Sequence, residues 1–188
     1  MRERVNFNSL SFCVNYPEQE WTFICCDIKY YLCAMKKIVL IGTSVAVCLA
    51  VGASAAYFQS GAIEEWYPTL VKPDITPPNW VFPIAWTIIY VCMGISIGLM
   101  LSRPYFVRLP AILLFSWQLL LNFLWSILFF AMRDVVLGFI DIVLLDIAVV
   151  LYMMNVYRVS KGAAWLFAPY VLWLAFASYL STYILVMN

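Results

Sequence analysis

The chain alternates long apolar stretches with short polar segments. A bilayer has a hydrocarbon core of about 30 Å, which a helix of roughly 20 apolar residues can cross. The stretches that qualify are residues 37–58, 80–101, 109–130, 135–157 and 163–186. A transmembrane β-barrel would instead show segments of about ten residues with alternating apolar and polar side chains. The pattern therefore predicts an all-α membrane protein, a bundle of five transmembrane helices with a long loop between helices 1 and 2.

The composition supports the same class. Hydrophobic residues make up 65% of the chain and charged residues 11%, and the mean hydropathy is +0.92. These values exceed what a soluble core of this length needs. The net charge of +1 gives no reason to expect a nucleic-acid partner.

Residues 1–34 differ from the rest, because they combine mixed charges with Cys13, Cys25, Cys26 and Cys33 and show no clear periodicity. Met35 is followed by two lysines and an apolar run, as at the start of many bacterial membrane proteins. We therefore predict a transmembrane domain over residues 35–188, preceded by an extension that is disordered or lies before the natural start. A zinc site at three of these cysteines is the alternative, but the chain has no histidine and the spacing matches no common zinc pattern.

The first apolar stretch also resembles a cleavable signal peptide, since two lysines precede it and Ala53, Ser54 and Ala55 form a small-residue cleavage pattern. The apolar run continues through residues 56–58, however, and cleavage would leave one span fewer. We interpret the stretch as the first helix.

Lysine and arginine are distributed unequally between the two sides of the predicted bundle. The side of Met35 carries Lys36, Lys37, Arg103, Arg108, Arg158 and Lys161, and the other side carries Lys72 and Arg133. For a bacterial inner-membrane protein, this asymmetry predicts that Met35 faces the cytoplasm and that the first loop and Asn188 face the periplasm.

The predicted first loop, residues 59–79, is much longer than the other connections. Loops of this length in compact proteins usually cover or bind something. The loop contains Pro68, Pro73, Pro77 and Pro78, each of which fixes φ. We interpret it as a semi-rigid lid, with an interfacial belt formed by Trp66, Tyr67 and Trp80 as the alternative.

The third predicted helix carries carboxamides at membrane depth. Gln118, Asn122, Trp125 and Phe129 are spaced four, three and four residues apart and so share one face. An unpaired carboxamide in the bilayer costs several kcal/mol, so this face should point into the bundle. Its polar partner is either another helix or a ligand.

Other positions predict local features. On the second helix, Phe82, Trp86, Tyr90, Met93 and Ile97 form an aromatic-rich stripe, and Gly94 and Gly98 form a GxxxG pair whose contact is expected within the bundle rather than in a dimer.

The polar and proline positions add further expectations. Asn79 and Asp134 are expected to cap the second and fourth helices, and Pro169 to kink the fifth in mid-membrane. Asp141 is expected to hydrogen-bond to the third or fifth helix, and Asp146 to lie near a helix contact.

The chain strongly resembles the TspO/MBR translocator proteins, also called tryptophan-rich sensory proteins or peripheral benzodiazepine receptors, from Met35 to Asn188. The matching residues are Trp66-Tyr67, Leu70 and Lys72-Pro73; Pro77-Pro78, Val81-Phe82, Trp86, Tyr90 and Met93-Gly94; Gln118-Leu119, Asn122, Trp125 and Phe129-Phe130; Gly138 and Asp141; and Pro169-Tyr170, Trp173, Ala175-Phe176-Ala177, Leu180 and Asn188.

The resemblance implies a five-helix bundle, usually a homodimer, whose first loop closes over a cavity for porphyrins, haem, sterols or benzodiazepine-type drugs. The candidate ligand-binding residues are Tyr67, Lys72, Pro77, Trp86, Tyr90, Gln118, Asn122, Trp125, Trp173 and Ala177. No metal site and no obligatory cofactor are expected. Because the commonest haem ligand, histidine, is absent, metal-free porphyrin is favoured over iron-ligated haem.

Two departures limit the resemblance. Asp74-Ile75-Thr76 precedes Pro77 where many members have a tryptophan, and Ser181 replaces a common asparagine, with no Lys or Arg after Lys161. The second departure removes the sterol pattern of the animal members.

Three functions remain open at this point. The first is a receptor that binds and senses tetrapyrroles, the second a transporter of porphyrins or sterols, and the third an enzyme that degrades porphyrin in light through Trp86 and Trp173. The lack of an apparent inverted repeat weakens the interpretation as a transporter, because many secondary transporters contain one.

Overall fold

A computed structural model describes residues 19–188, with side chains from residue 34 onward and at Tyr31 and Leu32. Most of the predicted extension, including the cysteines of the alternative zinc site, lies outside the described side chains. The chain divides into two compact units between Lys36 and Lys37, and the account below concerns Lys37–Asn188.

The described residues form helices and connecting segments, with no strand among them. The elements are α1 (Gln19–Glu65), η1 (Tyr67–Thr69), α2 (Val81–Leu101), α3 (Tyr105–Trp125), η2 (Ser126–Ala131), α4 (Val135–Tyr157), α5 (Lys161–Trp165) and α6 (Ala168–Met187). Five segments of the described chain are long and apolar enough to cross a membrane: Ala34–Glu65, Val81–Leu101, Tyr105–Ala131, Val135–Tyr157 and Lys161–Met187. This confirms the predicted all-α class and the five spans.

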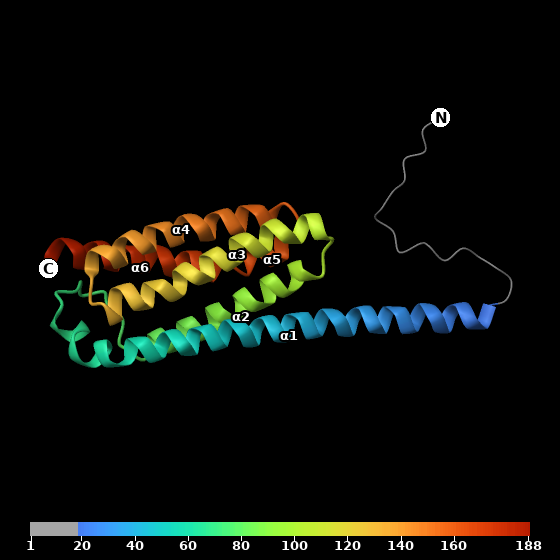
Figure 1. Ribbon diagram of the computed structural model, residues 1–188, viewed down its shortest axis with the longest axis horizontal. Helices are drawn as coiled ribbons and strands as arrows, with labels where there is room; N and C mark the ends of the chain where they lie inside the picture. The colour runs from blue at the N-terminus through green and yellow to red at the C-terminus, as the bar shows by residue number, and fades with distance from the viewer. Residues whose placement is uncertain (1–18) are drawn as a thin grey trace, which may run out of the picture. The chain divides into compact units, whose positions relative to one another are not determined.

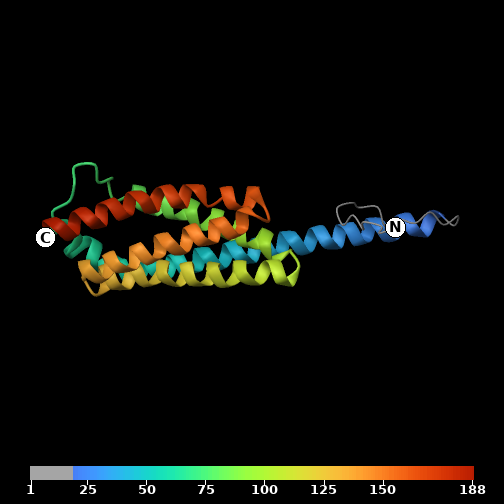
Figure 2. The ribbon, with the colours of Figure 1, turned by 90° about the horizontal axis from the view of Figure 1, so that it is seen from above.

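The spans run alternately up and down, so the connections gather at two ends of the bundle. The segment between α1 and α2, the turn between η2 and α4, and the C-terminus lie together at one end, which we call the loop end (Figures 1 and 2). Residues far apart in sequence therefore meet there, and they can close the bundle at that end.

Close packing of α1 on α2 depends on two glycines. A Cβ added to Gly94 would overlap the backbone of Val45, and one added to Gly98 would overlap that of Ile41. Because backbone cannot move aside as a side chain can, only glycine permits this approach. The predicted contact of the GxxxG pair within the bundle is therefore confirmed.

A buried polar contact joins α2, α4 and α5 away from the loop end. Ser96 Oγ donates to the carbonyl of Ala163 at 2.8 Å and lies 3.1 Å from the hydroxyl of Tyr152, which is fully buried. The Tyr152 ring packs on Phe167, with 4.3 Å between centroids. The short helix α5 is thereby fixed to its neighbours.

Several predicted helix ends were wrong. The first span continues to Glu65, so the loop comprises residues 66–80 rather than 59–79. The expected Asn79 cap was wrong, because no side chain caps α2. Trp80 precedes the helix, and the Val81 N–H donates to the carbonyl of Pro78. The cap by Asp134 is confirmed, since its Oδ1 accepts the Leu137 N–H at 2.9 Å.

The third and fifth spans are irregular in ways that differ from the prediction. The third span ends in the π-helical turn η2, which begins directly after Trp125. The fifth span is interrupted between α5 and α6, with Pro169 in the first turn of α6, where its missing N–H costs no hydrogen bond. The expected mid-membrane kink is therefore a break near the start of the span.

Substitution of Gly94 by alanine should destabilise the bundle, because the new methyl group meets backbone. Overpacking typically costs about 1–3 kcal/mol, which outweighs the roughly 1 kcal/mol that alanine gains over glycine in a helix. Gly42→Ala is the matched control, since nothing lies within 4 Å of its added Cβ. Thermal unfolding in detergent should show a lower midpoint for Gly94→Ala alone; equal midpoints for both variants would contradict the packing argument.

Candidate functional site

A cavity of about 290 Å³ lies within the bundle and reaches the loop end. All five spans contribute to its wall. The lining residues are Gly52, Ala55, Ala56, Gln59 and Ile63 of α1, Tyr67 and Asn79 of the loop, Phe82, Pro83, Trp86 and Tyr90 of α2, Asn122, Trp125, Ser126, Phe129 and Phe130 of α3 and η2, Ile142 and Leu145 of α4, and Trp173, Leu174, Ala177, Leu180, Ser181 and Ile184 of α6.

One wall of the cavity consists of aromatic rings from α2 and α6. The Trp86 ring stacks on Tyr90 with 5.6 Å between centroids, one helical turn away. It meets Trp173 edge to face at 6.4 Å, and Trp173 meets Phe82 in the same way at 5.7 Å. The offset and edge-to-face arrangements are the favourable ones for aromatic pairs.

A second aromatic wall comes from the third span. The Trp125 ring stacks almost parallel on Phe129, with 5.1 Å between centroids and 7° between planes. Phe130 packs edge to face against both rings. Rings from separate spans thus face the cavity from different sides.

A buried hydrogen-bond network joins the three helices that carry these rings. The Tyr90 hydroxyl donates to Asn122 Oδ1 at 2.6 Å, and Asn122 Nδ2 donates to the Tyr170 hydroxyl at 2.8 Å. All three residues are buried. The predicted polar partner of Asn122 is therefore a pair of tyrosines on other helices, which already engage both ends of its carboxamide.

The rest of the lining is weakly polar and uncharged. Gln59 Nε2 donates to Ser126 Oγ, which joins α1 to η2. Asn79 and Ser181 also line the cavity, and their side chains form no hydrogen bond with the described residues, so their polar groups are open to a ligand. No acidic or basic side chain of the described residues contributes to the wall. A ligand held here must be mainly apolar.

The loop covers the cavity through aromatic contacts with η2. The Trp66 ring lies 5.4 Å from Phe129, and the Tyr67 ring lies 5.7 Å from Phe130. Lys72 Nζ donates to the carbonyl of Tyr67 at 2.8 Å and sits 4.2 Å above its ring. Burial raises the pKa of the Tyr67 hydroxyl, and desolvation lowers the pKa of Lys72.

The side chain of Asn188 fastens the loop to the end of α6. Its Oδ1 accepts the Val71 N–H at 2.9 Å, and its Nδ2 donates to the carbonyls of Val71 and Ile184. The carboxamide therefore satisfies both polar groups of one loop residue, as a paired strand would. We call this contact the Asn188 latch.

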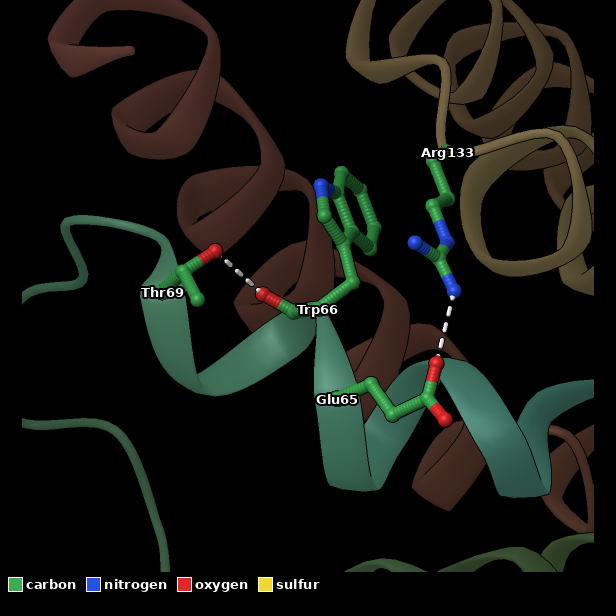
Figure 3. Close-up of polar contacts among 4 residues, drawn as sticks. All are labelled: Glu65, Trp66, Thr69 and Arg133. Atoms are coloured by element: carbon green, nitrogen blue, oxygen red, sulfur yellow. Dashed lines mark hydrogen bonds and ion pairs between the residues drawn. The ribbon is translucent and has the colours of Figure 1, made fainter.

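A third contact ties the end of α1 to the turn before α4 (Figure 3). Arg133 donates to Glu65 at 3.1 Å, and the Thr69 hydroxyl donates to the carbonyl of Trp66 beside it. Arg133 has a φ of 55°, in the left-handed region common where a helix ends. Both charged side chains are exposed, so this pair adds little stability and mainly orients the turn.

Most of the predicted site residues line this cavity, namely Tyr67, Trp86, Tyr90, Asn122, Trp125, Trp173 and Ala177. Lys72, Pro77 and Gln118 do not. Lys72 contacts the carbonyl and ring of Tyr67, and Gln118 is fully buried, with neither amide atom hydrogen-bonded to a described residue. The expected polar partner of Gln118 is therefore absent from the described residues.

The two aspartates of α4 behave differently from each other. Asp141 is buried and its Oδ2 has no hydrogen-bond partner in the described chain, so the expected bond to the third or fifth helix was wrong. Asp146 lies at a helix contact as expected, because the Ser178 hydroxyl donates to its Oδ2 at 2.6 Å. Neither aspartate lines the cavity.

Sequence reasoning missed several wall residues. Gln59 lies in a segment expected to be loop, and Asn79 was interpreted as a helix cap. At Gly52, an added Cβ would overlap the Tyr90 ring, so this glycine leaves the space that the ring occupies. Only the run of small residues at positions 52–56 could have pointed to this part of the wall.

The fold and the cavity define a class: a multi-pass integral membrane protein with an internal, aromatic cavity that has no charged side chain of the described residues in its wall. Residues 44–187 match the model of the TspO/MBR family. The chain belongs to this family.

Named relatives agree with this assignment. The tryptophan-rich protein TspO of Chlorobaculum tepidum is 41% identical over 81% of this chain and 98% of its own length. The tryptophan-rich protein TspO of Archaeoglobus fulgidus is 39% identical over 77% of this chain and 94% of its own. The translocator protein of Ovis aries is 34% identical over 62% of this chain and 70% of its own.

The two buried carboxamides of α3 should respond oppositely to substitution. Asn122→Leu leaves the hydroxyls of Tyr90 and Tyr170 without their partner and should cost about 1–3 kcal/mol of stability. Gln118→Met removes amide atoms that have no partner and should be neutral or stabilising. Unfolding in detergent compares the two variants, and a larger loss for Gln118→Met would refute the role assigned to the network.

Loss of the latch should loosen the loop without unfolding the bundle. In Asn188→Ala the Val71 N–H loses its acceptor, and hydrogen–deuterium exchange of loop residues 66–80 should become about tenfold faster, because each 1.4 kcal/mol of lost protection is a tenfold change. Thr182→Ala is the control, since this exposed hydroxyl bonds only within α6. Unchanged loop exchange in Asn188→Ala would contradict the latch.

Proposed function

We propose that this protein is a membrane receptor that binds tetrapyrroles such as protoporphyrin IX, and related hydrophobic ligands, and thereby senses or regulates porphyrin levels. The observation that carries the proposal is the uncharged cavity walled by Trp86, Trp125 and Trp173 from three different spans. Flat aromatic molecules gain from such walls, with about 0.5–1.5 kcal/mol per ring pair beyond area burial.

The electrostatics of the site restrict how a porphyrin could bind. Carboxylates are costly in an uncharged, largely apolar cavity. The macrocycle would therefore lie between the indoles with its propionates directed to the loop end, where Asn79, Gln59 and, beyond the wall, Lys72 offer donors. Gln118 and Asn122 are not the donors in this arrangement, because one lies outside the cavity and the other is engaged by tyrosines.

The names of the relatives are compatible with a receptor and also with a transporter. Relatives from bacteria and archaea are called tryptophan-rich proteins, one from Cereibacter sphaeroides a tryptophan-rich sensory protein, and those from mammals translocator proteins. We place this protein in a bacterial inner membrane, as a homodimer with the first loop in the periplasm. Transport of porphyrins or sterols and light-dependent degradation at Trp86 and Trp173 are the competing functions.

The test is titration of the purified protein with protoporphyrin IX in the dark, followed by illumination. We expect saturable binding that weakens about 3- to 10-fold in Trp86→Phe and in Trp173→Phe, because each loses part of a stacking surface. Trp165→Phe is the matched control, since Trp165 is exposed and does not line the cavity.

Each alternative gives a different result in the same preparation. Loss of porphyrin absorbance in light that requires Trp86 would indicate an enzyme, and flux into reconstituted vesicles would indicate a transporter. Stable absorbance in light together with tight binding supports the receptor. Absence of saturable binding by the wild type overturns the proposal.

A further inference from the structure

A second hollow lies against the cavity wall. It is a groove of about 390 Å³ between α2 and α6, lined by apolar side chains: Ala85, Ile88 and Ile89 of α2, and Pro169, Leu172, Trp173 and Phe176 of α6. Ile88 and Leu172 are exposed, with 53% and 73% of their surfaces accessible, so in a membrane the groove opens to the hydrocarbon.

Among the residues that the structure describes, Trp173 alone lines both the groove and the cavity. Its ring is partly buried and contacts Phe82, Trp86 and Phe176 edge to face or tilted, and no hydrogen bond to its indole is recorded among the described residues. A ring held by dispersion contacts alone changes rotamer more readily than one fixed by a hydrogen bond. The side chain shared by the two hollows is therefore one that no hydrogen bond to a described residue fixes.

The backbone beside this partition is also interrupted. Between α5 and α6, Leu166 and Phe167 leave the regular helix, and Pro169 lines the groove one turn before Trp173. Helix α5 is fixed to α2 through the Ser96 bond to Ala163. At this break the Phe167 N–H donates to the carbonyl of Ala164, three residues back, so the link between α5 and α6 is less regular than the helices on either side.

The loop end is closed by contrast. The Asn188 latch, the contact of Lys72 with Tyr67 and the packing of Trp66 and Tyr67 on η2 all hold the loop over the cavity. Passage there requires several of these contacts to break together. Beside Trp173, by contrast, the cavity and the groove share one ring, which is held by contacts with Phe82, Trp86 and Phe176.

We propose that the hydrophobic ligand enters and leaves the cavity laterally from the bilayer, between α2 and α6, with the Trp173 ring as the gate. The proposal rests on the proposed function, because it concerns the same ligand and cavity. Apolar ligands accumulate in the hydrocarbon core, so this route spares them a return to water and a crossing of the polar loop.

A gate alters the free-energy barrier to ligand entry and exit but not the free energies of the bound and unbound states. Variants in the groove should therefore change the association and dissociation rates by the same factor and leave the dissociation constant unchanged. Substitution of a cavity residue would change the dissociation constant instead. The two kinds of effect are separable in one kinetic experiment.

The experiment is stopped-flow measurement of protoporphyrin IX binding to the full chain in lipid nanodiscs. Ala85 lines the groove but not the cavity, so Ala85→Phe fills the groove from α2. We expect the association and dissociation rates both to fall at least fivefold, with the dissociation constant within twofold of wild type. Ile88→Ala widens the groove and should raise both rates. Ile84→Phe is the control, since Ile84 on α2 is as exposed as Ile88, at 53%, but lies outside the groove.

Entry through the loop end is tested with Asn188→Ala, which should leave the association and dissociation rates unchanged. Unchanged rates in Ala85→Phe and Ile88→Ala, with faster exchange of ligand in Asn188→Ala, would overturn the lateral gate and assign entry to the loop. Wild-type protein that binds protoporphyrin IX while the groove variants have no effect refutes the gate alone. Wild-type protein that does not bind it refutes the proposed function as well.

Discussion

The hydrogen bonds of Asn122 with Tyr90 and Tyr170 are the interaction on which the site depends. In a bilayer no water satisfies these groups, so the three helices must remain in the register that pairs them. The same register positions the indoles, because each lies about one turn from a member of the network: Trp86 before Tyr90, Trp125 after Asn122, and Trp173 after Tyr170. The need to pair these polar groups inside the membrane therefore fixes the positions of the rings that form the apolar pocket beside them.

The sequence was sufficient for the spans, the buried face of α3 and most of the aromatic wall. Helical periodicity and the cost of a polar group in lipid determine these features locally. The same arguments treated Gln118 and Asn122 alike, yet only Asn122 is paired. Its partners are Tyr90 and Tyr170, whose positions depend on how α2 and α6 are rotated about their axes. The residue spacing within α3 does not specify this rotation.

The loop illustrates the other limit of sequence reasoning. Its prolines predict a stiff segment, but its attachments involve residues remote in the chain, such as Asn188 with Val71 and Trp66 with Phe129. The helix also continues to Glu65, which moves Gln59 from the expected loop into the wall. Lys72, a predicted ligand-binding residue, lies outside the cavity wall and stabilises the loop by contact with the carbonyl and ring of Tyr67.

The uncharged wall and the fastened loop have a common consequence for selectivity. A cavity without basic residues cannot attract a charged ligand from water, and its loop is held by contacts that would all oppose opening to water. Both features favour molecules already dissolved in the membrane, for which the aromatic rings replace hydrocarbon by stacking. Trp173 then has two roles that conflict: a rigid ring would bind best, whereas a ring that turns admits the ligand. Because its indole forms no hydrogen bond with the described residues, we infer that the protein binds its ligand less tightly at this position and gains access from the bilayer.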